Sequence, residues 1–373
     1  MTEKSIPKYQ VVRDALTQWM ETGKLSPGDQ LPTESDLAEQ FGVSRQTVRQ
    51  AVGELVQKGV LERIQGSGTY YKGSGNGDFV GKNTRIVGVV TTYISDYIFP
   101  HIIRGIEGRL SEHNYSPLLY STQNNLVRER RALEDILDRG VDALIVEATK
   151  SATPNTNIDL YRVLAERGIP VVMMHAKYPE LEVPLIEVDD VEGGQLATRH
   201  LSSLGHSRIG AIMKLDDSQG VRRFEGFMDV MGQMRLEFKS DYLAFYSTEA
   251  VGIVANSYAR RLGGMDPQDR PTAVFCYNDA IATELIRYLR DEGVKVPDEI
   301  AVVGFDDAPV ASLSHPQLTT VAHPKVRMGT RAADVVLQCL DGRPPEPLVY
   351  TYPATLVERE STVSRLPLSG AMF

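Results

Sequence analysis

Residues 44–49 contain side chains suited to reading base pairs. Arg45, Gln46 and Arg49 follow Ser44 directly. In the major groove, arginine can donate two hydrogen bonds to guanine, and glutamine can form a bidentate pair with adenine. The alternative is an ordinary solvated helix face, because polar residues opposite an apolar stripe are typical of any surface helix. These three residues alone do not separate the two interpretations.

A second group of polar side chains follows short apolar runs that resemble buried strands. Asp96 and Phe99 follow residues 86–90, Glu147 follows 143–146, His175 and Lys177 follow 171–174, Arg223 lies beyond 209–212, and Asn278 and Asp279 follow 273–276. Carboxylates accept hydrogen bonds from hydroxyls, arginine and asparagine donate them, and an aromatic ring can cover an apolar sugar face. Such a set suits a neutral, hydroxyl-rich ligand. Each residue also has a structural alternative, since Asp279 could cap a helix and Arg223 could be solvated.

The elements around Arg45 predict a helix-turn-helix. Apolar residues at helical spacing indicate a first helix with Val12 and Leu16, and a capping box of Thr33 and Asp36 begins a second helix, which Gly42 ends. Ser44 caps a third helix with the apolar stripe Val48, Ala51, Val52, Leu55 and Val56. We expect its first turn to enter the major groove, with Thr47 beside Arg45 and the hydroxyls of Thr33 and Ser44 near the DNA backbone.

Two short strands after the third helix predict a wing. Residues 60–64 and 69–71 are strand-like, and Gly66 and Gly68 lie in the turn between them. The two glycines would allow the wing to approach DNA closely.

The longer part of the chain predicts an α/β fold with parallel sheets. Apolar strand-like runs, including residues 300–303, alternate with helix-like segments at 102–113, 126–139, 191–204 and 281–292. About 290 residues suggest two lobes with a cleft, and ligands of such sheets bind beyond the carboxyl ends of the strands. A Gly- and Ser-rich stretch separates the parts. We therefore expect a DNA-binding domain at 1–72, a flexible linker at 73–84 and an effector-binding and dimerisation domain at 85–373.

Charge, cysteine content and missing motifs narrow the class of protein. The net charge is −9, but acids and bases balance at nine each through Lys72, so a basic face on the head remains compatible with DNA. Two cysteines predict neither disulfides nor a metal site, and we expect no cofactor. No apolar run approaches the roughly 20 residues of a membrane span, and no signal peptide precedes the first helix, which predicts a cytoplasmic protein without membrane contact. An enzyme with an accessory domain is the alternative, but its nucleophile-elbow, zinc-helix and P-loop motifs are missing.

Residues 7–71 resemble the winged-helix head of GntR-type regulators. The resemblance rests on the motifs Leu31-Pro32-Thr33-Glu34, on residues 41–49, and on Gly66-Ser67-Gly68-Thr69. It implies that Arg45, Thr47, Arg49, Gly68 and Thr69 contact DNA. It implies that Gln46 occupies a more variable, specificity-setting position.

Residues 85–361 resemble the effector domain of LacI/GalR repressors, which is related to periplasmic sugar-binding proteins. The resemblance rests on residues 204–208, 223–227, 278–282 and 303–307. It implies that Arg223 and Asp279 hold sugar hydroxyls, and that Asp96, Phe99, Glu147, His175 and His323 line the same cleft. Two sites depart from the family pattern: the pair Asp96-Tyr97 replaces an asparagine-proline pair, and His175 replaces an aspartate.

The union of a GntR-type head with a LacI/GalR-type effector domain resembles a group of sugar-responsive bacterial repressors. It implies a homodimer on double-stranded, palindromic operator DNA that is released by a small neutral sugar, with L-arabinose as the inducer. The chemistry of the residues by itself does not favour arabinose over another pentose or a hexose.

Overall fold

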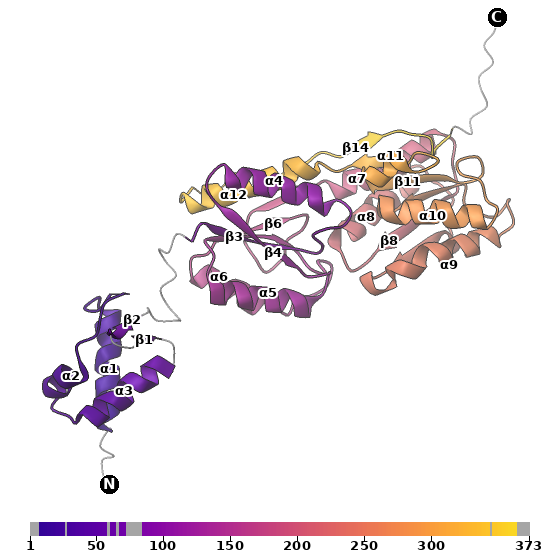
Figure 1. The fold of residues 1–373 in the computed structure, drawn as a ribbon. Coiled ribbons are helices and arrows are strands. Elements are labelled where there is room, and N and C mark those ends of the chain that lie inside the picture. Colours follow the sequence, from indigo (N-terminus) through magenta and orange to yellow (C-terminus); the bar gives the residue numbers. More distant parts are fainter. Residues whose placement is uncertain are drawn as a thin grey trace, which may run out of the picture. The chain divides into compact units, whose positions relative to one another are not determined.

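The computed structural model describes residues 7–26, 28–57, 60–64, 67–71, 84–343 and 345–363 (Figure 1). The chain divides into two compact units, Met1–Lys82 and Asn83–Phe373. Of the expected linker at 73–84, all but Thr84 lies outside the described residues. No helix in the described part of the chain is long and apolar enough to cross a membrane.

The described residues of the first unit form a winged helix-turn-helix, which confirms the predicted fold of the head. They form α1 (Lys8–Glu21), α2 (Glu34–Phe41), α3 (Arg45–Gln57), β1 (Leu61–Ile64) and β2 (Gly68–Tyr71). The two strands pair antiparallel, with Leu61 opposite Tyr71. The helices meet in an apolar core that includes Val12, Leu16, Leu37, Val48 and Leu55. Burial of this core leaves the opposite face of α3 in solvent.

The short turn between α2 and α3 follows from its capping residues. The Thr33 hydroxyl accepts a hydrogen bond from the Asp36 backbone N–H, and the Asp36 carboxylate accepts one from the Thr33 backbone, which completes the predicted capping box. Gly42 ends α2 with a left-handed φ of 62°. The Ser44 hydroxyl then accepts from the Thr47 backbone N–H at 3.2 Å and begins α3.

The second unit contains two lobes, and the first lobe is built on a parallel sheet in the order β13-β7-β6-β5-β3-β4. Its strands are β3 (Ile86–Thr91), β4 (Ser116–Ser121), β5 (Ala143–Glu147), β6 (Val171–Met174), β7 (Leu185–Val188) and β13 (Val349–Tyr352). α4 (Phe99–Ser111) and α12 (Lys325–Leu340) cover one face, and α5 (Leu126–Arg139) and α6 (Ile158–Glu166) cover the other (Figure 1).

The second lobe repeats this plan with the strand order β14-β12-β11-β10-β8-β9. Its strands are β8 (Ile209–Lys214), β9 (Leu243–Tyr246), β10 (Ala273–Cys276), β11 (Ala301–Asp306), β12 (Thr319–Ala322) and β14 (Thr355–Val357), of which β14 is antiparallel to β12. The helices are α7 (Asp190–Ser203), α8 (Ser218–Gln233), α9 (Val251–Gly263), α10 (Asp279–Asp291) and α11 (Pro309–Leu313), with 3₁₀ turns at Ser240–Tyr242 and Thr248–Ala250.

The chain passes from one lobe to the other between β7 and α7, between β12 and α12, and between β13 and β14. One apolar core continues through both lobes on the side of α4, α7, α8 and α12. The carboxyl ends of the parallel strands in the two sheets therefore face a common cleft, where such folds bind ligands.

Candidate functional site

The recognition helix α3 presents its first turn to solvent. Arg45 and Gln46 are exposed, Thr47 is half-buried, and Arg49 is exposed one turn later, while Val48 between them lies in the core. The hydrogen-bond donors that sequence analysis selected thus share one solvated face. The hydroxyls of Thr33 and Ser44 are exposed but are also used as helix caps.

Arg49 is already paired on this face. Its guanidinium donates to the Glu34 carboxylate at 2.8 and 3.0 Å, and Arg63 on the wing strand β1 donates to the same carboxylate at 3.2 Å. The hydrogen bond from Arg49 lowers the pKa of Glu34. Glu34 therefore connects the recognition helix to the wing. Arg63 was not singled out from the sequence, because its position beside Glu34 depends on the pairing of the wing strands.

Gly68 allows the wing to pack closely against Gln30 of the head. It has a φ of 138°, and a Cβ there would overlap the Gln30 side chain, whose amide donates to the Ser67 carbonyl at 2.6 Å. The Thr69 carbonyl accepts from the Leu31 backbone N–H at 2.8 Å. Gly66, the other predicted wing glycine, lies outside the described residues.

A cavity of about 250 Å³ lies between the lobes of the second unit. The structure brings most of the predicted effector residues together around it: Asp96, Phe99, Glu147, His175, Arg223, Asn278 and His323. Lys177 is half-buried after β6 but is not among the residues that line the cavity. The cavity is smaller than the ~300–1,000 Å³ typical of sites for drug-sized ligands.

Arg223 is the fixed cation of the cavity wall. It is buried on α8, where its Nε donates to Asp190 at 2.8 Å and an Nη donates to the Tyr277 carbonyl at 2.7 Å. Burial works against its charge, but the carboxylates of Asp190 and Asp306 raise its pKa. The guanidinium also stacks 3.5 Å from the Phe305 ring centroid. These contacts fix a planar set of donors at the cavity edge.

The structure does not bring the Asp279 carboxylate to the cavity. That carboxylate accepts from the Thr320 hydroxyl at 2.6 Å and from the Ala308 backbone N–H at 2.7 Å, so it anchors the loop after β11. Asn278 and Asp306 line the cavity in its place. The burial of Asp279 raises its pKa well above the usual value.

Tyr97 joins the two lobes at the cavity wall. Its hydroxyl donates to Asp306 at 2.7 Å and accepts from the Asp279 backbone N–H at 3.1 Å. The tyrosine thus crosses from the loop before α4 to the ends of β10 and β11. Tyr97 is the second residue of the Asp96-Tyr97 pair, which replaces asparagine-proline in the family pattern. Asp96 beside it is exposed.

A chain of three buried side chains, Glu147, His175 and His323, lines the cavity. The Glu147 carboxylate accepts from the Thr92 backbone N–H at 2.7 Å and lies 3.2 Å from Nδ1 of His175. Nε2 of His175 lies 3.0 Å from Nε2 of His323. Burial lowers the pKa of His175, but Glu147 outweighs this and raises it overall. Burial and the neighbouring His175 lower the pKa of His323 well below its usual value.

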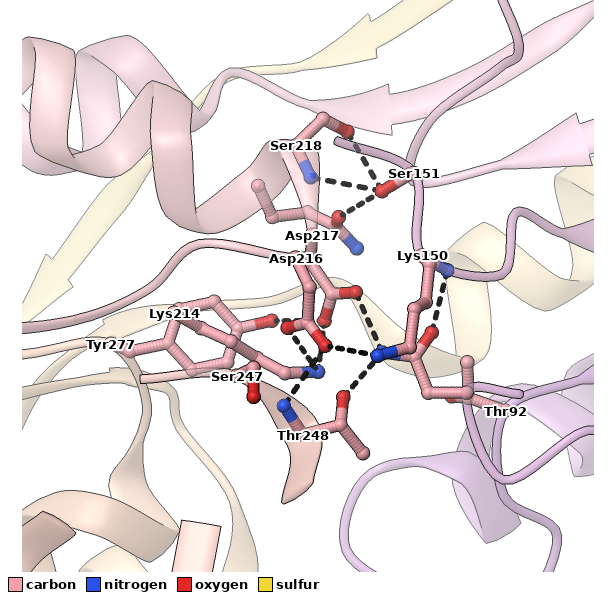
Figure 2. Close-up of polar contacts among 12 residues, drawn as sticks. Thr92, Lys150, Ser151, Lys214, Asp216, Asp217, Ser218, Ser247, Thr248 and Tyr277 are labelled. Carbon is pink, nitrogen blue, oxygen red and sulfur yellow. Dashed lines mark hydrogen bonds and ion pairs between the residues drawn. The ribbon is translucent and has the colours of Figure 1, made fainter. Parts of the chain in front are cut away.

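Several cavity residues were not singled out from the sequence, among them Tyr97, Lys214, Asp217, Tyr246, Tyr277 and Asp306. Lys214, Tyr246 and Asp306 each end a strand, so the strand-end rule used for Glu147 contained a signal for them. Lys214 donates to Asp217 at 2.5 Å, and the Tyr277 hydroxyl lies 3.3 Å from the same carboxylate (Figure 2). Within the described residues, no group of histidine, cysteine, aspartate and glutamate side chains is arranged to hold a metal ion.

Family models match both parts of the chain. Residues 8–70 match the bacterial regulatory proteins of the gntR family. Residues 198–362 match the periplasmic binding protein-like domain. A crystal structure of the lac repressor dimer bound to operator and the anti-inducer ONPF superimposes with a TM-score of 0.65 at 22% identity, over 76% of this chain and 96% of that one, which shows a shared fold.

Curated relatives match nearly the whole chain. The arabinose metabolism transcriptional repressor of Geobacillus stearothermophilus is 42% identical over 363 residues, 97% of this chain and 99% of that protein. The protein of the same name from Halalkalibacterium halodurans is 40% identical over 336 residues, 90% of this chain and 89% of that protein. The chain therefore belongs to the family of the arabinose metabolism transcriptional repressors, and it is a sugar-responsive transcriptional repressor, not an enzyme.

Proposed function

We propose that this repressor binds a palindromic operator as a homodimer and is released when L-arabinose binds between its lobes. The observation that carries the sugar part is the pairing of charges in the cavity. Arg223 is matched by Asp190 and Asp306, Lys214 by Asp217, and Glu147 by His175. A charged ligand would leave one of these buried charges without its partner, whereas a neutral sugar can exchange hydrogen bonds with all of them.

The choice of arabinose rests on the relatives, which are named for arabinose metabolism, and the L form rests on the family resemblance alone. A pentose also suits the small volume of the cavity. Phe99, Arg223 and Asn278 line the cavity, where the aromatic ring would meet the C–H side of the sugar and the two polar side chains would bind its hydroxyls.

The DNA part rests on the exposed first turn of α3. Arg45 and Gln46 are the side chains placed to read bases, and Arg49, Thr69 and the backbone near Gly68 are placed for phosphates. One such helix reads few bases, so a dimer on two half-sites supplies the specificity, as in the lac repressor dimer on its operator. Because a repressor must reach operator DNA, the protein acts in the cytoplasm.

Release of the operator requires that the sugar bind two lobe arrangements with different affinity. Asp96, Phe99 and Glu147 belong to the first lobe, while Arg223 and Asn278 belong to the second. A sugar that contacts both groups stabilises the closed arrangement. The dimer then transmits that arrangement to the two heads.

One pair of substitutions tests both sites. Arg223→Lys keeps the charge between Asp190 and Asp306 but removes the planar donors, so we expect the affinity for L-arabinose in calorimetry to fall at least tenfold, about 1.4 kcal/mol. Arg222→Lys is the control, because the neighbouring Arg222 pairs with Glu187 and does not line the cavity. Arg45→Ala should weaken operator binding by about 1–3 kcal/mol and leave sugar binding unchanged.

The same measurements also show which part of the proposal is wrong. If the wild type binds another pentose or a hexose in place of L-arabinose, the sugar assignment is wrong and the site stands. If Arg45→Ala binds the operator as tightly as the wild type, the recognition-helix assignment is wrong.

A further inference from the structure

A polar cluster outside the cavity joins the two lobes directly (Figure 2). It consists of Asn124, Lys150 and Ser151 from the loops after β4 and β5 of the first lobe, and of residues from the segments that follow β8 and β9 of the second: Asp216, Asp217, Ser218, Thr248 and Glu249. Only Asp217 and Thr248 of these residues also line the cavity. The cluster is therefore continuous with the effector site but distinct from it.

Lys150 forms the ionic part of the cluster. Its Nζ lies 3.2 Å from Asp216 and 2.6 Å from Glu249, both in the opposite lobe. Asp216 is buried, whereas Glu249 is exposed. The hydrogen bond from Lys150 contributes most to lowering the pKa of Glu249, to about 2. Glu249 is thus ionised at neutral pH, where it can pair with Lys150.

Hydrogen bonds donated by uncharged groups reinforce the ion pairs. The buried Asn124 amide donates to Asp217 at 3.0 Å and to the Thr248 hydroxyl at 2.6 Å. The Ser151 hydroxyl accepts from the Ser218 backbone N–H at 2.9 Å. Each of these bonds crosses from one lobe to the other, so none of them survives separation of the lobes.

The backbone adopts an uncommon conformation at two of these residues. Asn124 and Lys150 have left-handed φ values of 53° and 46°. A lysine in this region is uncommon, and such conformations persist where the surrounding contacts determine them. Here the Lys150 backbone N–H donates to the Asn124 side-chain oxygen at 2.7 Å, which holds the two residues together as one unit facing the second lobe.

We infer that this cluster is an interlobe latch, in which Asn124, Lys150 and Ser151 hold the lobes closed without contacting the sugar. The inference rests on the proposed function in one respect: the latch sets the fraction of the protein in the sugar-binding arrangement. The apparent dissociation constant for the sugar is the intrinsic constant divided by that fraction. The latch residues are thus positioning residues for effector binding, and their strength sets the sugar concentration at which repression ends.

Lys150→Met in the full-length protein tests the latch. We expect the dissociation constant for L-arabinose to rise about three- to tenfold, because two ion pairs, one to the buried Asp216 and one to the exposed Glu249, are lost from the closed form alone. Arg130→Met is the matched control, since Arg130 also pairs with two carboxylates, Glu134 and Asp159, but both lie in its own lobe. The control should change sugar affinity by less than about twofold.

The salt dependence of sugar affinity distinguishes the latch from a purely structural role of Lys150. The affinity of the wild type for the neutral sugar should weaken as salt increases, because salt screens the exposed Lys150–Glu249 pair. In Lys150→Met this dependence should disappear. Glu249→Gln combined with Lys150→Met should weaken sugar binding no more than Lys150→Met alone, because the two residues act through one contact.

Hydrogen exchange without sugar separates the latch from the proposed function. The backbone N–H groups of Ala152 and Ser218 donate across the lobes, to the Asp216 carbonyl and the Ser151 hydroxyl. Both should exchange several-fold faster in Lys150→Met and at the wild-type rate in Arg130→Met. Unchanged exchange in Lys150→Met would overturn the latch. If exchange accelerates but no neutral sugar binds the wild type, the latch holds and the effector assignment fails.

Discussion

At the scale of single residues, the contact between His175 and His323 makes the cleft sensitive to protons. Nε2 faces Nε2 at 3.0 Å, so one ring must donate and the other accept. With Glu147 beside His175 and Lys325 and Arg223 near His323, the proton belongs on His175. His175 then donates to both neighbours, and His323 stays neutral.

This arrangement predicts a loss of stability in mild acid. Since His323 has a lowered pKa in the folded protein, its contribution is present above the unfolded value of about 6.5 and is lost as the pH falls below it. The free energy of unfolding should therefore decrease by up to about 1.4 kcal/mol per pH unit from pH 6.5 to 5.5. His175, whose pKa is raised, acts in the opposite sense above pH 6.5.

Urea unfolding measured through the tyrosine near-UV signal reports mainly on the effector domain, because only Tyr9, Tyr70 and Tyr71 of the 16 tyrosines lie in the head. His323→Gln should remove the acid loss, and the exposed His315→Gln should retain it. An equal loss in the wild type and in His323→Gln would contradict the assigned protonation.

For individual site residues, the sequence determines some positions and leaves others open. The rule that ligands meet the ends of parallel strands selected Glu147, His175 and Asn278, all of which line the cavity. It does not decide between neighbours such as Asn278 and Asp279, which point in different directions at the start of α10. That choice depends on Thr320 and Ala308, which approach Asp279 from later parts of the chain.

At the scale of elements, helix pairs approach through glycines behind the cavity. A Cβ on Gly194 of α7 would overlap the Arg223 carbonyl, and one on Gly226 of α8 would overlap the Val191 carbonyl. α7 therefore lies against the backbone that carries the cavity arginine. The position of Arg223 depends on this close approach.

Gly194→Ala should displace α8 at Arg223. We expect a loss of about 1–3 kcal/mol in stability, together with weaker sugar binding. Gly232→Ala on α8 is the control, because a Cβ there has open space and alanine should stabilise the helix by about 0.5–1 kcal/mol. Urea unfolding and calorimetry measure both effects. Wild-type sugar affinity in Gly194→Ala would contradict the dependence of Arg223 on this contact.

Sequence patterns predicted some strands and missed others. Continuously apolar runs identified β3, β5, β6, β8, β10 and β11, which have neighbours on both sides in their sheets. The edge strands β4, β13 and β14 each expose a polar residue and produce no such run, while the edge strand β9 is short and exposes Phe245. Their assignment requires the pairing partner, which a local pattern does not contain.

At the scale of the whole molecule, charge separates the two functions. The head is balanced through Lys72, so the entire net charge of −9 belongs to the remainder. An acidic body repels DNA, which leaves operator contact to the head. Sugar and operator are then coupled only through the arrangement of lobes and heads.

Coupling of this kind acts in both directions. Saturating operator DNA should weaken the binding of L-arabinose by the same factor by which the sugar weakens operator binding, typically about 5–150-fold. In Arg45→Ala, the same DNA concentration should leave sugar affinity unchanged. Calorimetry with and without operator measures the effect, and equal sugar affinity for free and operator-bound wild type would contradict the two-state mechanism.

The interleaved lobes also affect how the protein is made. The first lobe is complete only when α12 and β13, ending at Tyr352, have left the ribosome, whereas the head ends by Tyr71. At about 5–20 residues per second, the head precedes a complete effector domain by roughly 15–60 s of translation. A newborn chain therefore holds one folded head well before the sensor that restrains it is complete, and chain termination before residue 352 leaves the first lobe unfinished.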